Sequence, residues 1–369
     1  MVIIKTSDWL IGENKAGGKK FWRLHILRDG TNYYTQTSWY QLSRTGRETK
    51  RQLSDPYYAT PTNEGRANAR DSKEQAEFEF EAVIKKQRDK GFGYDGETRQ
   101  MYPMPMLAHK FTEHKGKMEF PVFVQPKLNG MRVLFDGKNG WSRGNKEVIP
   151  QVIQHLTFDT GGVILDGELM LPNNVLLQES MSAIKKYRPG ISDKLKYYVY
   201  DIVDATKSYD ERFALLVEMF SRGDLPKNVV LVGTASAQTE IEVFGLHKTF
   251  VAEGFEGTMV RDPRASYEIG KRSYSLLKLK DFVDAEYKIT AVIDGDGSDR
   301  GLAIFVLDNG HGQQFNCRPE GTQENRAELF RNRKTLVNSF LTVRYQELSR
   351  DNIPIFPVGV GIRDLKDFS

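Results

Sequence analysis

Lys127 and Arg132 stand on either side of a tight turn in the segment V-F-V-Q-P-K-L-N-G-M-R-V, residues 122–133. The apolar residues on both flanks and the central Asn129-Gly130 pair predict a buried β-hairpin. A hairpin that served packing alone would exclude both cations, because buried charge is costly unless it is paired. The segment therefore predicts that both side chains lie at the floor of a cleft.

Four later segments bring further charged and aromatic residues onto predicted strands. They are V-I-L-D-G-E-L-M with Asp166 and Glu168, K-Y-Y-V-Y-D-I with Tyr200 and Asp201, F-E-G-T-M-V-R with Glu256 and Arg261, and L-L-K-L-K-D-F with Lys278 and Lys280. Strand residues two positions apart share a face of the sheet. We therefore expect these strands to carry their charges to one cleft.

The side-chain types in this set are those of a phosphoryl-transfer site. Lysines and arginines hold polyphosphate, carboxylates hold a divalent metal that neutralises phosphate oxygens, and an aromatic ring stacks on a base. A lysine can also act as a nucleophile, although free lysine has a pKa of about 10.4 and must first lose its proton. The set predicts phosphoryl transfer, either directly or through a covalent intermediate on a lysine.

These motifs resemble those of the covalent nucleotidyltransferase superfamily, and most closely the ATP-dependent DNA ligases of the small phage and viral type. The resemblance covers residues 103–369. It rests on K-L-N-G-M-R (motif I), S-R-G-N-K at 142–146 (motif Ia), L-D-G-E-L (motif III), Y-Y-V-Y-D (motif IIIa), E-G-T-M-V-R (motif IV), L-K-L-K (motif V) and F-P-V-G-V-G-I-R-D-L-K-D (motif VI).

The resemblance implies a role for each matching residue. Lys127 is the expected nucleophile that takes AMP from ATP, with Arg132, Lys278 and Lys280 as further catalytic residues that hold phosphate. The implied nucleotide-binding set is Gln125, Lys127, Leu128, Arg132, Glu168, Tyr200 (the ring that stacks on adenine), Lys278, Lys280, Arg363 and Lys366, the last two orienting pyrophosphate together with Asp364. Glu168 and Glu256 are the implied ligands of Mg²⁺, and Arg143 is expected to contact DNA phosphate.

The implied reaction has three steps. Lys127 is adenylated, AMP moves to the 5′-phosphate of a nick in duplex DNA, and the 3′-hydroxyl expels AMP.

Three positions depart from the pattern: Asn129 replaces the more common Asp of motif I, Val358 stands where an arginine often occurs, and Leu365 stands where an acid often occurs. An RNA ligase, a GTP-using capping enzyme and a non-catalytic DNA-break binder remain alternatives. An NAD-dependent ligase is disfavoured because its four-cysteine zinc module is missing.

The elements that position these residues predict an α+β protein of three domains. Residues 101–282 would form the adenylyltransferase (ATP-grasp-like ligase) domain, with strands at 120–126, 131–136, 163–170, 196–203, 229–233, 257–261 and 275–280 and a helix at 211–220. After Asp281, short strands separated by Gly/Asp/Asn turns suit a small barrel. By resemblance, residues 283–369 are an OB-fold.

Residues 1–100 are expected to form a small α+β DNA-binding domain. Strands flank the turn R-D-G-T-N, and residues 71–90 read as a helix capped by Asp71 or Ser72. The order of elements resembles a WGR domain, although Leu42-Ser43-Arg44 stands in place of Trp-Gly-Arg. Residues 1–70 hold 12 Lys/Arg and 6 Asp/Glu, whereas the whole chain is only +4, which favours a nucleic-acid partner. Expected phosphate contacts are Arg44, Arg47, Lys50 and Arg51.

Composition argues against a disulfide-bonded protein, a multi-cysteine metal protein and a membrane protein. The single cysteine, Cys317, rules out a disulfide within the chain or a multi-cysteine metal site, and the six histidines lack metal-ligand spacing. No segment reaches the roughly 20 apolar residues of a membrane helix, and the first residues do not resemble a signal peptide. We therefore expect a cytoplasmic protein of a bacterial or phage-infected cell. The resemblance to DNA ligases further implies a monomer that associates with the nucleoid.

Overall fold

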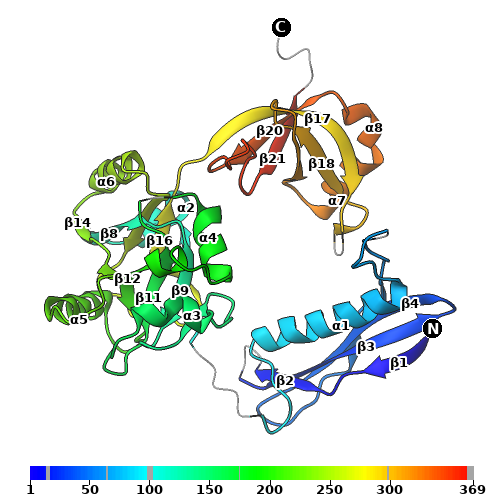
Figure 1. The fold of residues 1–369 in the computed structure, drawn as a ribbon, viewed down its shortest axis with the longest axis horizontal. Helices are drawn as coiled ribbons and strands as arrows, with labels where there is room; N and C mark the ends of the chain where they lie inside the picture. Colours follow the sequence, from blue (N-terminus) through cyan, green and yellow to red (C-terminus); the bar gives the residue numbers. More distant parts are fainter. Residues whose placement is uncertain (14–16, 64, 98–102, 174, 297–298, 364–369) are drawn as a thin grey trace.

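The structure is a computed structural model, and it describes residues 1–13, 17–63, 65–97, 103–173, 175–296 and 299–363. Figure 1 shows three bodies in chain order: a sheet crossed by a helix, a body built on two sheets, and a small barrel. We call them the front module (to Glu97), the central domain (Pro103 to Phe282) and the barrel (from Val283). No helix in the described part of the chain is both long and apolar enough to span a bilayer.

The front module is an antiparallel sheet in the order β1-β3-β4-β5, with β2 beside β3 and β6 beside β4. The strands are β1 (Val2–Thr6), β2 (Leu10–Glu13), β3 (Lys19–Asp29), β4 (Asn32–Leu42), β5 (Gln52–Leu53) and β6 (Tyr57–Tyr58). β3 and β4 pair along their whole length up to Asp29 opposite Asn32. The predicted pair of strands around this turn is confirmed.

Helix α1 (Ser72–Asp89) covers one face of this sheet, as the pattern of residues 71–90 predicts. Asp71 begins it: its carboxylate accepts from the Glu74 N–H (2.8 Å), and the Glu74 carboxylate accepts from the Asp71 N–H (3.0 Å). This capping box satisfies two otherwise unpaired donors. The core between helix and sheet contains Leu10, Trp22, Leu24, Ile26, Ala76, Phe80 and Ile84.

The central domain contains two five-stranded sheets, ordered β10-β9-β11-β12-β13 and β14-β8-β15-β16-β7. We call them the first and the second sheet. Their strands are β7 (Leu107–Lys110), β8 (Val122–Lys127), β9 (Met131–Phe135), β10 (Gly140–Ser142), β11 (Leu165–Met170), β12 (Lys196–Ile202), β13 (Val229–Leu231), β14 (Ala235–Ala237), β15 (Gly257–Arg261) and β16 (Arg272–Leu279). Every segment predicted as a strand in this part of the chain contains one.

The predicted hairpin at residues 122–133 is wrong. β8 pairs with β14 and β15 in the second sheet, whereas β9 pairs with β10 and β11 in the first. Leu128 is buried against Met170 and Val232, so the chain between the strands crosses from sheet to sheet instead of turning back. Gly130 permits the crossing, because a Cβ at this position would lie 2.6 Å from the Leu169 carbonyl oxygen. Lys127 and Arg132 therefore belong to different sheets.

Helices cover the outer face of each sheet and leave the inner faces to form a cleft. α3 (Pro150–Ile153), α4 (Leu177–Lys185) and α5 (Tyr209–Ser221) contribute to the core of the first sheet. α2 (Phe111–His114) and α6 (Glu240–Ala252) do so for the second. Val122 and Val124 face the second core, so the alternation along β8 directs Gln125 and Lys127 into the cleft.

The barrel closes in the order β17-β18-β19-β21-β20. Its strands are β17 (Val283–Asp294), β18 (Ala303–Asp308), β19 (Gln314–Pro319), β20 (Phe340–Tyr345) and β21 (Val358–Arg363). Cys317 lies in its core among Phe305, Leu307 and Val343. Sequence patterns missed α7 (Gln323–Arg331) and α8 (Arg333–Leu336), because only part of each helix packs on the barrel core.

Candidate active site

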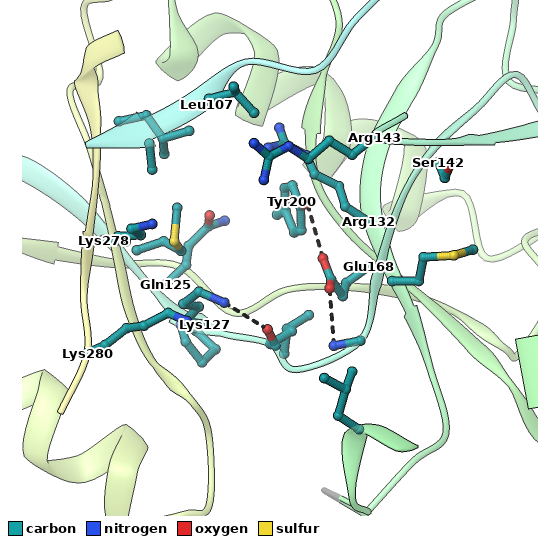
Figure 2. Close-up of a pocket in the computed structure, with 18 of the residues that line it drawn as sticks. Leu107, Gln125, Lys127, Arg132, Ser142, Arg143, Glu168, Tyr200, Lys278 and Lys280 are labelled. Atoms are coloured by element: carbon teal, nitrogen blue, oxygen red, sulfur yellow. Dashed lines mark hydrogen bonds between the residues drawn. The ribbon is translucent and has the colours of Figure 1, made fainter. Parts of the chain in front are cut away.

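A cavity of about 660 Å³ lies between the inner faces of the two central sheets. Figure 2 shows Gln125, Lys127, Lys278 and Lys280 on the side of the second sheet, and Arg132, Arg143 and Glu168 on the side of the first. The predicted residues that line it are Gln125, Lys127, Leu128, Arg132, Arg143, Glu168, Tyr200, Lys278 and Lys280. The structure thus brings together most of the predicted nucleotide-binding set.

Lys127 ends β8 and forms an ion pair with Glu256. The other carboxylate oxygen of Glu256 pairs with Lys280, so one carboxylate bridges two lysines of the second sheet. Burial alone would raise the pKa of Glu256, but the ammonium groups of Lys127 and Lys280 outweigh it and hold the pKa below its ordinary value. Glu256 is therefore ionised at neutral pH, and it organises the lysines in the absence of a ligand.

Lys278 and Lys280 extend the positive charge along β16 and the residue after it. Burial, followed by the charges of Arg272 and Lys127, lowers the pKa of Lys278. Burial and Lys127 likewise lower the pKa of Lys280. Cations held this close repel one another, so an anion bound among them would relieve that repulsion.

Glu168 faces these lysines from β11 on the first sheet. Its carboxylate accepts from the Gly130 N–H (3.1 Å), and the Tyr200 hydroxyl lies 3.5 Å away. Burial raises the pKa of Glu168 to about 7, despite the opposing charges of Lys127 and Arg132. This carboxyl group therefore holds its proton to higher pH than an exposed glutamate does, and the approach of a cation favours its ionisation.

Hydrogen bonds to residues far away in the sequence hold the Arg132 guanidinium in place. Its Nε donates to Asp166 Oδ1 (2.8 Å) and its Nη1 to the Met106 carbonyl (2.6 Å), while Nη2 pairs with the second Asp166 oxygen. The Tyr267 hydroxyl also donates to Asp166 (2.7 Å). A fully buried carboxylate thus fixes the guanidinium at the cavity wall.

Tyr200 presents its ring at the same wall. The guanidinium carbons of Arg132 and Arg261 lie 5.8 and 5.3 Å from the ring centroid. Burial raises the pKa of Tyr200 well above its ordinary value, so the hydroxyl keeps its proton and donates to the Gly167 carbonyl (3.3 Å). A half-buried ring in this position suits stacking on a flat ligand.

Other predicted residues lie elsewhere. Arg363 ends β21 on the barrel, is exposed and is not among the cavity-lining residues, while Lys366 and Asp364 lie outside the described residues. Arg44, Arg47 and Lys50 line a shallow, exposed hollow on the front module. Arg51 lies over the rings of Trp9 (5.5 Å) and Tyr40 (5.3 Å). The DNA contacts expected of these four and of Arg143 stay predictions.

Sequence reasoning missed a contribution of the barrel to this site. In the loop between β20 and β21, Gln346 accepts from Lys280 Nζ (3.0 Å), Glu347 accepts from Asn129 Nδ2 (3.1 Å), and Phe356 lines the cavity. No local pattern distinguishes these residues, because only the approach of the barrel gives them a role. The contact also supplies a physical reason for Asn129: an aspartate there would face the carboxylate of Glu347.

We expect Asn129→Asp to weaken the contact between barrel and central domain by about 1–2 kcal/mol, because two carboxylates would replace an amide–carboxylate hydrogen bond. Dyes placed on the two bodies would report a shift toward larger separations by energy transfer. Glu347→Gln in the same protein restores a neutral hydrogen bond and should reverse the shift. Asn145→Asp is the matched control; an equal shift in it, or no reversal, would contradict the assignment.

The carboxylates that the structure describes do not form a complete metal site unless a nucleotide is also bound. Among the described residues, no three His, Cys, Asp or Glu side chains gather closely enough to hold a metal ion by themselves. Of the two predicted carboxylates, Glu168 lines the cavity from the first sheet, whereas Glu256, the residue before β15, is not among the lining residues and reaches the site through its ion pair with Lys127. Since Mg²⁺ usually takes one or two carboxylates together with substrate phosphates, this donor set fits a metal that arrives with a nucleotide.

Comparisons with known proteins point to one family. Residues 105–280 match a sequence model described as "ATP dependent DNA ligase domain". A DNA ligase of African swine fever virus is 30% identical over 295 residues, 72% of this chain and 70% of that protein. A DNA ligase of Haemophilus influenzae is 27% identical over 63% of this chain and 83% of its own length. Among solved structures, a Lig E DNA ligase superposes with a TM-score of 0.61 at 21% identity, over 71% of this chain and all of that one, which shows a shared fold.

Proposed function

Because this chain belongs to the ATP-dependent DNA ligases, we propose that it seals nicks in duplex DNA through a covalent Lys127–AMP intermediate. The observation that carries the proposal is the place of Lys127 at the floor of the cavity. Three lysines converge there from the second sheet, opposite Tyr200 and Glu168 on the first. Self-adenylation followed by nick sealing is the activity that the family supports.

In the first step, Lys127 Nζ attacks the α-phosphorus of ATP. The Lys127 ammonium first loses one proton to solvent. An N–P bond then forms, the P–O bond to pyrophosphate breaks, pyrophosphate departs, and a second N–H proton passes to solvent. The attack requires Nζ to leave its ion pair with Glu256, since only the neutral amine is a nucleophile. Lys278 and Lys280 lie where they can stabilise charge on the phosphoryl oxygens as it develops.

In the second step, a 5′-phosphate oxygen of the nick attacks the same phosphorus and releases Lys127. In the third, the 3′-hydroxyl attacks the 5′-phosphorus, a phosphodiester forms, and AMP leaves. Both are in-line displacements in which the protein mainly positions groups. Arg132, fixed by Asp166, is proposed to hold phosphate during these steps.

We assign Glu168 and Glu256 as the protein ligands of Mg²⁺. A bound divalent cation neutralises phosphate oxygens. The raised pKa of Glu168 suits this role, because the group would ionise when the cation binds. Glu256, which pairs with Lys127 and Lys280 in the structure, would be the second carboxylate available to hold the cation.

We assign the remaining parts of the chain to the first step and to DNA binding. The closed barrel is proposed to be an OB-fold that presents Arg363 and Lys366 for the first step, and residues 1–100 a WGR-like DNA-binding domain, with boundaries near residues 100 and 282. We further propose a monomer that works on DNA in the cytoplasm, at the nucleoid.

The proposal is tested with nucleotides labelled at the α-phosphate. The protein with magnesium should become covalently labelled by ATP and release the label to nicked duplex DNA with sealing of the nick. Label from neither nucleotide would contradict the proposal, and preferential label from GTP would favour a capping enzyme. Sealing of nicked RNA in preference to DNA would favour the RNA-ligase alternative.

The front module allows a separate prediction about affinity. Arg47→Ala with Lys50→Ala should weaken binding to nicked duplex and reduce the slope of log K against log salt by about 2, because each lost phosphate contact changes it by about 0.9. Self-adenylation should stay unchanged, since both residues lie in the exposed hollow of the front module. Lys85→Ala with Lys86→Ala, on exposed positions of α1, is the control. Equal slopes of log K against log salt in the two double variants would reject a role in DNA binding for the exposed hollow of the front module.

A further inference from the structure

We propose that the front module holds an unpaired strand of DNA by stacking its bases on the face of the sheet that α1 leaves uncovered. This role rests on the proposed DNA binding by residues 1–100 and is independent of the chemistry at Lys127. The surface, which we call the aromatic face, consists of Trp9, Phe21, Arg23, Tyr40 and Arg51. It adds a site for bases to the phosphate contacts proposed for this module.

The two faces of the front sheet carry different side chains. Trp22 of β3 lies in the core beneath α1, so the alternation along the strand turns Phe21 and Arg23 to the other face. On β4, Tyr40 lies directly opposite Phe21 and shares that face. In the part of the front module that the structure describes, α1 is the only helix, and Figure 1 shows it on one side of the sheet, so no helix described in this module covers the aromatic face.

Three rings on this face contact one another. Phe21 and Tyr40 are stacked, with ring centroids 4.6 Å apart and ring planes 3° from parallel. Trp9 meets these two rings edge-on, with centroid distances of 6.5 Å and 5.1 Å. All three side chains remain half-buried. Partly exposed aromatic rings gathered in one place are typical of a binding surface.

Two arginines lie on these rings and supply positive charge. The guanidinium carbon of Arg23 lies 4.4 Å from the Trp9 ring centroid, and Arg23 is held there because its Nε donates to the Ser38 hydroxyl (3.3 Å). The guanidinium carbon of Arg51 lies 5.5 Å from the Trp9 centroid and 5.3 Å from the Tyr40 centroid. Arg51 is exposed, and cation–π contacts at exposed sites are weak. Arg51 can therefore leave the rings for a phosphate while a base takes its place.

The basic hollow of the front module continues from the aromatic face along the chain. Tyr40 is followed by Gln41, the first residue that lines the hollow. Arg51 follows Lys50, the last residue that lines it. Among the described residues that line the hollow, Glu48 is the only acid. Rings beside cations match a strand whose bases stack and whose phosphates need countercharge.

Stacking on these rings selects unpaired bases. Inside a duplex, neighbouring base pairs cover both π-faces of a base, so rings on a protein sheet cannot stack on it. An unpaired base exposes its π-faces, and every base has them, so the aromatic face accepts single strands of any sequence. A strand that runs from the aromatic face into the hollow is the unpaired DNA that adjoins a break, as in a flap or a cohesive end.

The test is binding of a labelled oligothymidylate of about 12 nucleotides to the full chain, measured by fluorescence anisotropy at moderate salt. Tyr40→Leu should weaken this binding about tenfold or more, the order expected for losing a ring on which a base stacks. Tyr40→Trp keeps a π-face and should retain the affinity. Phe78→Leu is the matched control, because Phe78 is exposed on α1 and also lies beneath an arginine, Arg70 at 3.7 Å. Equal affinities for the oligomer in Tyr40→Leu and Phe78→Leu would overturn the proposal.

Cross-linking gives a second readout that a structural defect would not imitate. An oligothymidylate that carries iodouracil should cross-link on irradiation to Trp9, Phe21 or Tyr40, as mapped by mass spectrometry. Cross-links confined to other parts of the chain would overturn the proposal, and this result decides even if Tyr40→Leu does not fold. Tighter binding to a blunt hairpin duplex than to the oligomer would also overturn it.

Binding to nicked duplex separates this proposal from the one on which it rests. If the unsubstituted chain binds nicked duplex but not the oligomer, the aromatic face does not bind single strands, whereas the phosphate contacts proposed for the hollow stand. If the chain binds neither, the DNA-binding role of residues 1–100 fails as well.

Discussion

We expect Lys127→Arg protein to take no label from ATP and to seal nicks at least about 10⁴-fold more slowly, which is the order of loss expected for removal of a covalent nucleophile. Arginine preserves the positive charge and the ion pair with Glu256. A guanidinium does not deprotonate in proteins, so it cannot attack. The loss therefore reports the nucleophile and not the charge of residue 127. The measurement is covalent label after reaction with ATP, followed by sealing of a nicked duplex.

Two controls sharpen this prediction. Lys138→Arg changes an exposed lysine in the loop between β9 and β10 and should retain full labelling. A nick supplied with its 5′-phosphate already adenylated needs only the third step, so Lys127→Arg should seal it within about tenfold of the unsubstituted rate. Retained labelling in Lys127→Arg, or equal loss on both substrates, would show that another residue is the nucleophile or that the substitution damages the site.

We expect the free energy of unfolding of the Asp201→Asn protein to be about 3–5 kcal/mol lower than that of the unsubstituted protein. Asp201 is fully buried and pairs with two buried arginines, Arg212 at 2.7 Å and Arg261 at 2.8 Å. A neutral amide would leave both guanidinium groups without a countercharge, and unpaired buried charge is the most expensive consequence of breaking such a pair. Calorimetry should show the transition of the central domain lowered by roughly 10 °C.

Glu218→Gln is the matched control for Asp201. Glu218 lies on α5, the same helix as Arg212, and pairs with Arg222 at 3.6 Å, but both side chains are exposed. Exposed pairs of this kind contribute about 0–1 kcal/mol. If Asp201→Asn lowers stability no more than this control does, the buried network is not what stabilises the central domain.

Local patterns were sufficient for seven of the ten strands of the central domain and for most of the cavity, but they missed the short strands β7, β10 and β14. Alternation alone places Lys278 and Lys280 on one face, and the structure shows both at the cavity. The same reasoning failed at Asn129-Gly130, a pair typical of two-residue hairpins. There the burial of Leu128 and the lack of space at Gly130 favour a crossing between sheets. Turn propensity is local, whereas the partners of β8 and β9 lie far away in the chain.

The roles of residues that form contacts between the barrel and the central domain could not be predicted from the sequence. Glu347 gains a role only because the barrel brings it to Asn129. The helices α7 and α8 were missed for a related reason. Residues whose function depends on long-range packing carry no periodic signal of their own.

The crossing between the two sheets also bears on the mechanics of the central domain. Lys127 belongs to one sheet, and Glu168 and Tyr200 belong to the other. AMP attached to Lys127 and stacked on Tyr200 would act as a cross-link between two layers that a single short segment, residues 128–130, joins at this point. Openings that separate the layers should then become rarer, and backbone amides of β8 and β11 should exchange with deuterium more slowly in the adenylated protein. The covalent intermediate would thus serve as a temporary structural brace as well as a carrier of AMP.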